Sequence, residues 1–131
     1  MRPFLLAAFA LSFAFAAATP ASAQNVGAAG SVAILRGLDK VTGQYRDFSA
    51  PAGKPVKFYT LDIVVRACQK APAEEAPETA VFVEVTDTPL KKKGAEEPKP
   101  VKMLSGWIFG SSPALNALEH PVYDVWAIDC R

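Results

Sequence analysis

The sequence has little that could support catalysis or metal binding. It contains one histidine and two cysteines, and the cysteines lack the close Cys-x-x-Cys spacing of redox and zinc sites. No Asp-x-Asp-x-Asp-Gly calcium loop, Gly-rich phosphate loop or Gly-x-Ser-x-Gly nucleophile elbow is present. At 131 residues the chain is also too short for a multidomain enzyme or a doubly wound nucleotide-binding domain. We therefore expect no metal and no cofactor.

The chain also lacks a charge excess of either sign. It carries 14 basic and 13 acidic residues, and 13 of each once Arg2 is set aside. The main basic cluster, Lys91–Lys93, is followed by Glu96 and Glu97, as in a solvated loop. A nucleic-acid-binding protein is expected to have a basic excess or stripe. We therefore expect no nucleic-acid partner.

One apolar run stands out, at the start of the chain. Arg2 precedes 15 residues from Phe4 to Ala18 that are broken only by Ser12, and Ala21-Ser22-Ala23 supplies small residues for signal peptidase. The run is shorter than the roughly 20 residues that span a bilayer. Residues 1–23 are thus expected to be a cleaved signal peptide, giving a periplasmic protein without stable membrane insertion after cleavage.

The remaining 108 residues suit one small domain. We expect a flexible, small-residue leader at 24–31 and a single β-rich domain at 32–131. Two segments rich in charge and proline, 69–79 and 88–100, are expected to be mobile loops, because such composition does not offset its own ordering entropy.

Both cysteines, Cys68 and Cys130, follow the predicted signal. An even count in an oxidising compartment favours one disulfide. Closing a loop of about 63 residues is worth roughly 4 kcal/mol on the chain-entropy model, as an upper figure. A redox pair and two metal ligands are the alternatives, and both usually need closer spacing.

Apolar alternation predicts six or seven strands and one short helix. Val81, Val83 and Val85 alternate with Phe82 and Glu84, for example, as in a strand with one buried face. The expected strands are Val32–Leu38, Gln44–Ser49, Val56–Cys68, Ala80–Asp87, Val101–Phe109 and Val122–Cys130. Together they favour a small antiparallel β-sandwich or barrel.

The one expected helix covers 114–119. Ser112 is a candidate N-cap, Pro113 suits the first helical position, and Pro121 ends the helix after His120.

Three motifs carry a resemblance to a known family. The segment Ser105–Trp126 reads SGWIFGSSPALNALEHPVYDVW and resembles the C-terminal signature of domain of unknown function 2155, found chiefly in alphaproteobacteria. Arg36–Gly43 resembles the N-terminal signature, and Arg66-Ala67-Cys68 with Asp129-Cys130 matches the cysteine pair. The resemblance spans about Ala33 to Cys130 and implies an exported, disulfide-bearing domain with no established activity.

The chain departs from this family at one position. Members commonly read Phe-Gly-x-Leu where this chain has Phe58-Tyr59-Thr60-Leu61. Tyr59 does not favour the bulge or tight bend that a glycine would allow.

A possible enzymatic cluster comprises Ser111, Ser112, Glu119, His120 and Asp124. A small envelope hydrolase could use Ser112 or Glu119 with His120, but it would need these groups to converge beside an oxyanion hole. The competing interpretation is structural: Ser112 caps the helix, and Glu119 and His120 bond backbone at its exit.

The two tryptophans offer a further possibility. Trp107 and Trp126 could form a carbohydrate platform, but tryptophan on late strands of a small β domain more often fills the core.

The hypothesis that fits best is a non-enzymatic binding or envelope-assembly module. Its partner would be an envelope protein or glycan, and an edge strand could accept a peptide. An inhibitor that inserts a charged loop into a partner's cleft is a third possibility, and nothing indicates an oligomeric state. The expected binding surface comprises Trp107, Ser112, Glu119, His120 and Tyr123.

Overall fold

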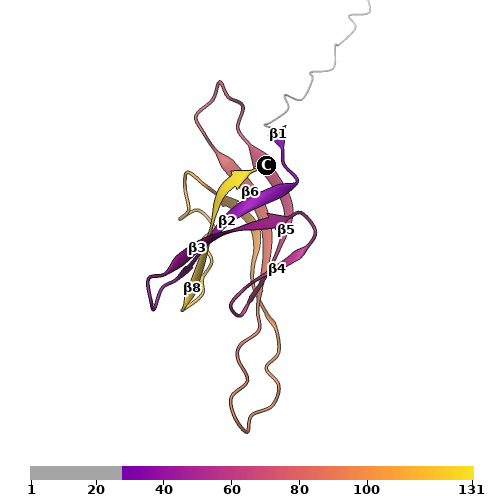
Figure 1. Ribbon diagram of the computed structural model, residues 1–131, viewed down its shortest axis with the longest axis vertical. Helices are drawn as coiled ribbons and strands as arrows, with labels where there is room; N and C mark the ends of the chain where they lie inside the picture. The colour runs from indigo at the N-terminus through magenta and orange to yellow at the C-terminus, as the bar shows by residue number, and fades with distance from the viewer. Residues whose placement is uncertain (1–27) are drawn as a thin grey trace, which may run out of the picture.

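The computed structural model describes residues 28–131 (Figure 1). The predicted signal peptide, 1–23, and the first part of the predicted leader lie outside the described residues. Within the leader, Ala28 and Ala29 form a short strand that pairs with Gln69 and Lys70. Among residues 28–131, no helix is long and apolar enough to cross a membrane.

The described chain is all-β, as the sequence predicts, and forms two antiparallel sheets. In the larger sheet the order is β1-β5-β6-β7, with β4 also pairing with β5; in the smaller sheet it is β3-β2-β8. The larger sheet contains β1 (Ala28–Ala29), β4 (Pro55–Phe58), β5 (Leu61–Lys70), β6 (Thr79–Asp87) and β7 (Val101–Phe109); the smaller contains β2 (Val32–Asp39), β3 (Tyr45–Pro51) and β8 (Tyr123–Cys130).

One apolar core lies between the sheets. Its side chains are those that the predicted alternation places on the inner faces of the strands. Val81, Val83 and Val85 of β6 have no exposed surface. Fully burying such a side chain stabilises a fold by about 1.5–3 kcal/mol. The other core side chains of the strands include Leu61, Ile63 and Val65 of β5, Ala33 and Leu35 of β2, and Val125 and Ala127 of β8.

The strand predicted at 56–68 is instead a hairpin. β4 and β5 pair with Phe58 opposite Leu61, which leaves Tyr59 and Thr60 as a two-residue turn. Tyr59 has φ +53°, a left-handed conformation that such turns require and that glycine or asparagine normally supplies. The expectation that Tyr59 disfavours a tight bend is therefore wrong, because the chain keeps the turn with a tyrosine in it.

The predicted helix at 114–119 is absent. The amide of Leu115 donates to the Ser112 carbonyl at 3.0 Å, which closes a single turn. Asn116 then enters the left-handed region at φ +64°, so the helical path cannot continue. Its side-chain amide donates to the Trp107 carbonyl at 2.9 Å. The prediction failed because local capping signals cannot anticipate this tertiary hydrogen bond, and Ser112 caps no helix.

The predicted disulfide is present. Cys68 at the end of β5 is bonded to Cys130 at the end of β8, with their Cα atoms 5.8 Å apart. The bond therefore joins the larger sheet to the smaller one.

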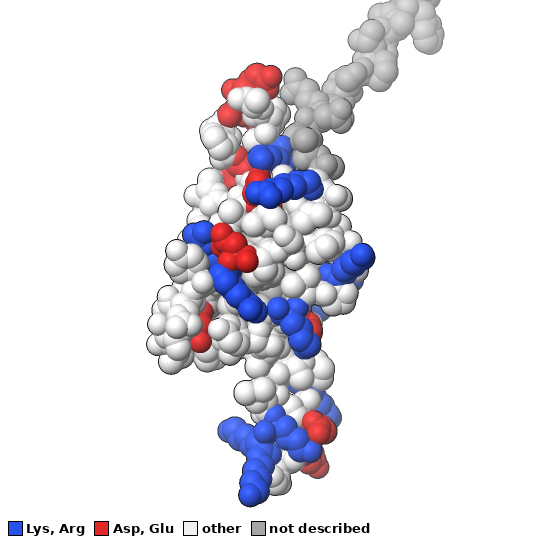
Figure 2. All heavy atoms as spheres, viewed as in Figure 1, with Lys and Arg blue, Asp and Glu red and all other residues white. Residues whose placement is uncertain are grey.

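The two charged hairpin loops project from opposite ends of the molecule (Figure 1). They carry opposite charge: the 71–78 loop is acidic at its tip, and lysines gather on the 88–100 loop (Figure 2).

Candidate functional site

The structure brings together two of the five residues expected to bind a partner. The rings of His120 and Tyr123 stack with centroids 5.1 Å apart. Ser112 and Glu119 lie in the irregular connection between β7 and β8, and Trp107 lies on β7. No hydrogen bond or ring contact within residues 28–131 joins these three to His120.

Neither tryptophan fills the core. Trp107 lies opposite Phe82 in the β6–β7 register, and their rings meet edge to face at 5.5 Å. Phe82 alternates with the buried valines of β6, so this pair lies on the outer face of the larger sheet. Trp126 is likewise flanked by the buried Val125 and Ala127 and points away from the core. The preference for a core role was wrong because strand periodicity, and not residue type, decides the face.

His120 is buried, with 7% of its side chain exposed. Its Nδ1 accepts the backbone N–H groups of Val122 and Tyr123 at 3.1 and 3.0 Å. Nδ1 therefore carries no proton, and Nε2–H donates to Asp87 Oδ2 at 3.3 Å. Both ring nitrogens are thus engaged, and the imidazole fixes the entry into β8.

Around His120 lies a stack of rings that we call the aromatic end: Phe58, Tyr59, His120 and Tyr123. Tyr59 stacks on Tyr123 at 5.1 Å with an interplanar angle of 2°, and Phe58 meets both tyrosines edge-on. Burial raises the pKa of the Tyr123 phenol, and the charge of Asp39 adds to this. The stack holds Tyr59 in its left-handed conformation.

The two segments that resemble family signatures, Arg36–Gly43 and Ser105–Trp126, meet at the aromatic end. A Cβ on Gly37 would collide with the Phe58 ring, and the Lys40 ammonium donates to the His120 carbonyl. Arg46 lies over the Phe58 and Tyr59 rings, at 5.2 and 5.6 Å. Phe58 and His120 are therefore covered by packing, whereas Tyr59 stays 52% exposed beside a hollow of about 140 Å³.

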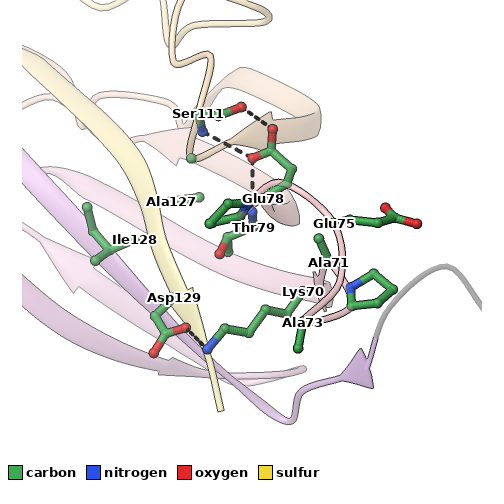
Figure 3. A pocket seen from close by; sticks show the side chains of 13 residues that line it. Lys70, Ala71, Ala73, Glu75, Glu78, Thr79, Ser111, Ala127, Ile128 and Asp129 are labelled. Carbon is green, nitrogen blue, oxygen red and sulfur yellow. Dashed lines mark hydrogen bonds and ion pairs between the residues drawn. The ribbon is translucent and has the colours of Figure 1, made fainter.

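A larger hollow lies at the opposite end of β8, and we call it the groove (Figure 3). Its volume is about 530 Å³. Residues 127–129 of β8 form one side, the acidic 71–78 loop forms the other, and Gly110 and Ser111 close one end. The complete lining is Lys70, Ala71, Pro72, Ala73, Glu75, Pro77, Glu78, Thr79, Gly110, Ser111, Ala127, Ile128 and Asp129.

Glu78 fixes the acidic loop to the end of β7. Its Oε1 accepts the N–H groups of Thr79 and Ser111 at 2.9 and 3.1 Å, and its Oε2 accepts the Ser111 hydroxyl. The Ser111 hydroxyl and these backbone amides hold the pKa of Glu78 below its usual range. Sequence reasoning placed Ser111 in a possible catalytic cluster and missed Glu78, because 33 residues separate the two.

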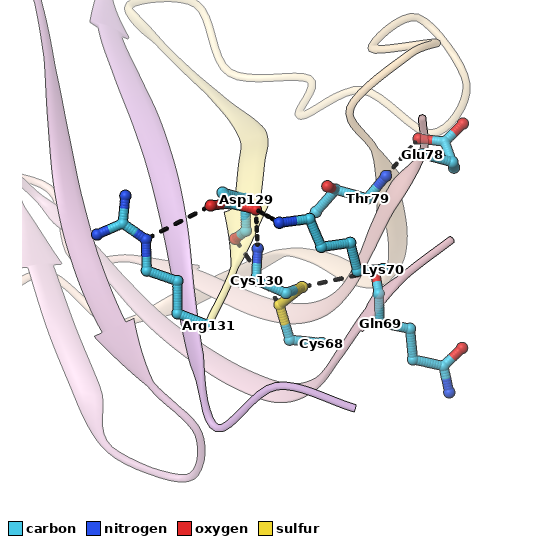
Figure 4. The surroundings of a disulfide bond; sticks show 8 residues. All are labelled: Cys68, Gln69, Lys70, Glu78, Thr79, Asp129, Cys130 and Arg131. Carbon is cyan, nitrogen blue, oxygen red and sulfur yellow. Dashed lines mark hydrogen bonds and ion pairs between the residues drawn. A yellow bond between two sulfur atoms is a disulfide. The ribbon is translucent and has the colours of Figure 1, made fainter. Parts of the chain in front are cut away.

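On the opposite side of the groove, Lys70 forms an ion pair with Asp129 at 2.6 Å. Hydrogen bonding from Lys70 lowers the pKa of Asp129, and the Cys130 amide also donates to this carboxylate at 2.9 Å. The Cys68–Cys130 disulfide lies next to the pair (Figure 4). This end of the molecule, which we call the disulfide end, is therefore fixed both covalently and by charge.

The groove exposes one edge of β8. Within residues 28–131, β8 pairs with β2 on one side and with no strand on the other. A bulge in that pairing leaves Ile128 without a partner residue, and 41% of it is exposed. An open strand edge offers backbone donors and acceptors to a further chain.

No group of three or more His, Cys, Asp or Glu side chains gathers in the described part of the chain. Two of the three carboxylates of the groove, those of Glu78 and Asp129, are engaged by Ser111, Lys70 and backbone amides, whereas Glu75 is exposed. The groove is therefore suited to contacts with a backbone and with charged side chains.

Comparisons with known proteins show which family the chain belongs to. The family model described as an uncharacterized protein conserved in bacteria, DUF2155, matches residues 33–130. An uncharacterized protein of Rickettsia prowazekii (strain Madrid E) is 25% identical over 93 residues, covering 71% of this chain. The chain spans 56% of that relative's length, and no solved structure matches. The chain therefore belongs to this uncharacterized bacterial family.

Proposed function

We propose that this protein is exported to the periplasm and acts there as a non-enzymatic binding module that holds an extended polypeptide in the groove. The observation that carries the proposal is an edge of β8 that pairs with no strand among residues 28–131 and lies along one wall of a hollow of about 530 Å³. Added strands gain affinity from main-chain hydrogen bonds and specificity from pockets for alternate side chains. This edge favours a polypeptide over a glycan as the partner.

The groove combines apolar and acidic walls. Pro72 and Ile128 provide apolar surface, while Glu75 stands exposed on the loop. The lowered pKa values of Glu78 and Asp129 keep both carboxylates ionised at neutral pH. The one cation in the lining, Lys70, is paired with Asp129. A segment that combines an apolar side chain with basic side chains therefore matches the groove best.

The geometry of His120 also favours binding over hydrolysis. Both ring nitrogens are engaged, by backbone amides and by Asp87. A general base must lie within hydrogen-bonding reach of the proton that it abstracts, and no hydrogen bond joins His120 to Ser112 or Glu119 in the described chain. The alternative of a small hydrolase gains no support from this arrangement.

A photo-crosslinking experiment tests the proposal. A photoreactive amino acid is placed at Ile128 in the groove, or as a matched control at Val41, which is 76% exposed in the β2–β3 turn. After irradiation of cells that produce the protein, mass spectrometry identifies the adducts. We expect adducts at Ile128 to lie in extended segments containing Lys or Arg, with few at Val41. Equal labelling at both positions, or none at Ile128, would contradict the proposal.

A further inference from the structure

The 88–100 loop, which we call the basic arm, has a charge opposite to that of the groove. It carries four lysines and two glutamates, whereas the 71–78 loop beside the groove carries three glutamates and no basic residue. Figure 2 shows the two at opposite tips of the molecule. The basic arm and the acidic loop beside the groove therefore carry complementary charges.

The basic arm also exposes an apolar side chain with no packing partner of its own. Leu90 is 82% exposed, the highest value among the large exposed apolar residues, and it is followed directly by Lys91–Lys93. Within residues 28–131, no backbone hydrogen bond involves Leu90 or Lys91. Leu90 and Lys91 lie outside any turn or strand, so their backbone is free to pair with a strand edge. The turn that follows is closed by the Ala95 amide, which donates to the Lys92 carbonyl at 3.1 Å. The exposed Lys91 ammonium pairs with Glu97 at 2.8 Å.

We propose that the groove of one copy binds residues 90–93 of the basic arm of a second copy. This inference rests on the proposed function of the groove and names its occupant. Leu90 would meet the apolar surface of Pro72 and Ile128, and the lysines would meet Glu75 in the groove and Glu74 beside it on the loop. The backbone of Leu90 and Lys91 would add to the open edge of β8, with Lys92 and Lys93 at the start of the adjoining turn.

The occupant must come from another copy because of the geometry of β6. The groove adjoins Thr79 at the start of this nine-residue strand, and the arm follows Asp87 at its end. A rise of about 3.3 Å per residue separates them by roughly 30 Å. An arm thus cannot reach its own groove, and the contact is head to tail, which forms open chains or a closed ring.

The proposed contact is small and ionic, so we expect its strength to depend on protein and salt concentration. A short segment buries less than the ~1,200 Å² of a standard stable interface, so association should depend on protein concentration. Contacts between exposed charges are screened by salt, with a Debye length of about 8 Å at 0.15 M. Association should therefore weaken as salt is added.

Charge reversal provides the test, using the full chain with its disulfide intact. The arm variant carries Lys91→Glu, Lys92→Glu and Lys93→Glu; the groove variant carries Glu74→Lys and Glu75→Lys. Analytical ultracentrifugation measures association of each alone and of their equimolar mixture. We expect at least about a tenfold loss for each variant alone, and recovery in the mixture, where opposite charges meet again at both contacts.

Two further variants keep the test specific. Leu90→Ala preserves all charges and should still weaken association, whereas Lys54→Glu reverses an exposed lysine in the β3–β4 connection and should have no effect. The inference is overturned if the wild type stays monomeric at every concentration. It is also overturned if the mixture shows no recovery.

Failure of this inference can be separated from failure of the proposed function. If the wild type is monomeric but Ile128 still crosslinks to basic segments of other proteins, the groove binds polypeptide and only the second copy is the wrong occupant. If the wild type is monomeric and Ile128 labels no polypeptide, both are wrong.

Discussion

The two ends of β8 differ in how side chains fill the space beside the strand. At the aromatic end, the buried Phe58 and His120 pack with Tyr123, and the half-exposed Tyr59 covers them from outside. At the disulfide end, a hollow of about 530 Å³ is left open, and its walls are joined by the Cys68–Cys130 bond and by charged contacts.

The two ends therefore differ in how they are stabilised and in whether they leave surface for a partner. An open hollow forgoes the close packing that stabilises protein interiors, and a covalent link offsets that loss without filling the space. At the aromatic end, both ring nitrogens of His120 are engaged by the protein itself, and the neighbouring Asp87 Oδ1 is buried without a partner among the described residues. The disulfide end retains an unpaired strand edge and exposed glutamates.

The largest effect should come from removing the disulfide. Replacing both cysteines, Cys68→Ala with Cys130→Ala, should lower the free energy of unfolding by about 4 kcal/mol at most, because a long closed loop regains its entropy. Urea denaturation against the wild type measures the loss. A change below about 1 kcal/mol would show that the charged contacts alone hold the disulfide end together.

At the aromatic end, His120→Ala should be strongly destabilising because it removes a buried hydrogen-bonding hub. It leaves the amides of Val122 and Tyr123 and the Asp87 carboxylate without their partner, at a cost of about 2–3 kcal/mol. The same unfolding measurement checks this. The neighbouring exposed residue provides the control, since Glu119→Ala should stay within about 0.5 kcal/mol. Equal effects of the two would contradict the role given to His120.

Tyr59 allows strain and stacking to be measured separately. Tyr59→Ala loses the stack on Tyr123 but keeps a side chain in the left-handed conformation, whereas Tyr59→Gly loses the stack and relieves the strain. Such strain costs about 1–2 kcal/mol. We therefore expect Tyr59→Gly to be about 1 kcal/mol more stable than Tyr59→Ala. Equal stability of the two variants in thermal unfolding would argue against a strained turn.

The smallest effect concerns Glu78 and pH. Its pKa is lowered in the folded protein, chiefly by the Ser111 hydroxyl, so it contributes stability above the unfolded carboxyl pKa of about 4.3. That contribution is lost as the pH falls through the lowered folded value. Ser111→Ala should cost less than about 1 kcal/mol at pH 7, and the difference from wild type should vanish in acid.

NMR titration of the Glu78 carboxyl tests the cause directly. Its pKa should move up toward the ordinary value in Ser111→Ala, while that of Asp129, held by Lys70, should not change. A Glu78 pKa that is the same in both proteins would rule out the hydroxyl as the main cause.

The sequence predicts those features of the fold that local periodicity and residue counts control. The alternation of Val81, Val83 and Val85 predicts the buried face of β6, and an even cysteine count predicts the disulfide. The hairpin turn at Tyr59 was missed because its residue type argues against the left-handed conformation that the ring stack stabilises. The helix at 114–119 was predicted wrongly because its end is fixed by a bond from Asn116 to the backbone of β7.

The groove was the least predictable feature. Glu78 was assigned to a mobile loop and Ser111 to a catalytic cluster, and only the fold shows that they bond to each other. Ile128 carries no sequence signal of an open edge, because the pairing of β8 with β2 alone is a property of the sheet order. Patterns along the chain predict which face is buried, but not which edge is left free.

The most direct measurement of the central claim is an NMR titration of the isotopically labelled, disulfide-intact protein at low concentration. The probe is a synthetic peptide with the sequence of residues 89–94, and the control peptide has glutamates in place of its lysines. The account predicts saturable, salt-sensitive shifts of the Ser111 and Ile128 amides with the basic peptide only, and none at Tyr123. Shifts confined to Tyr123, or equal shifts with both peptides, would contradict it.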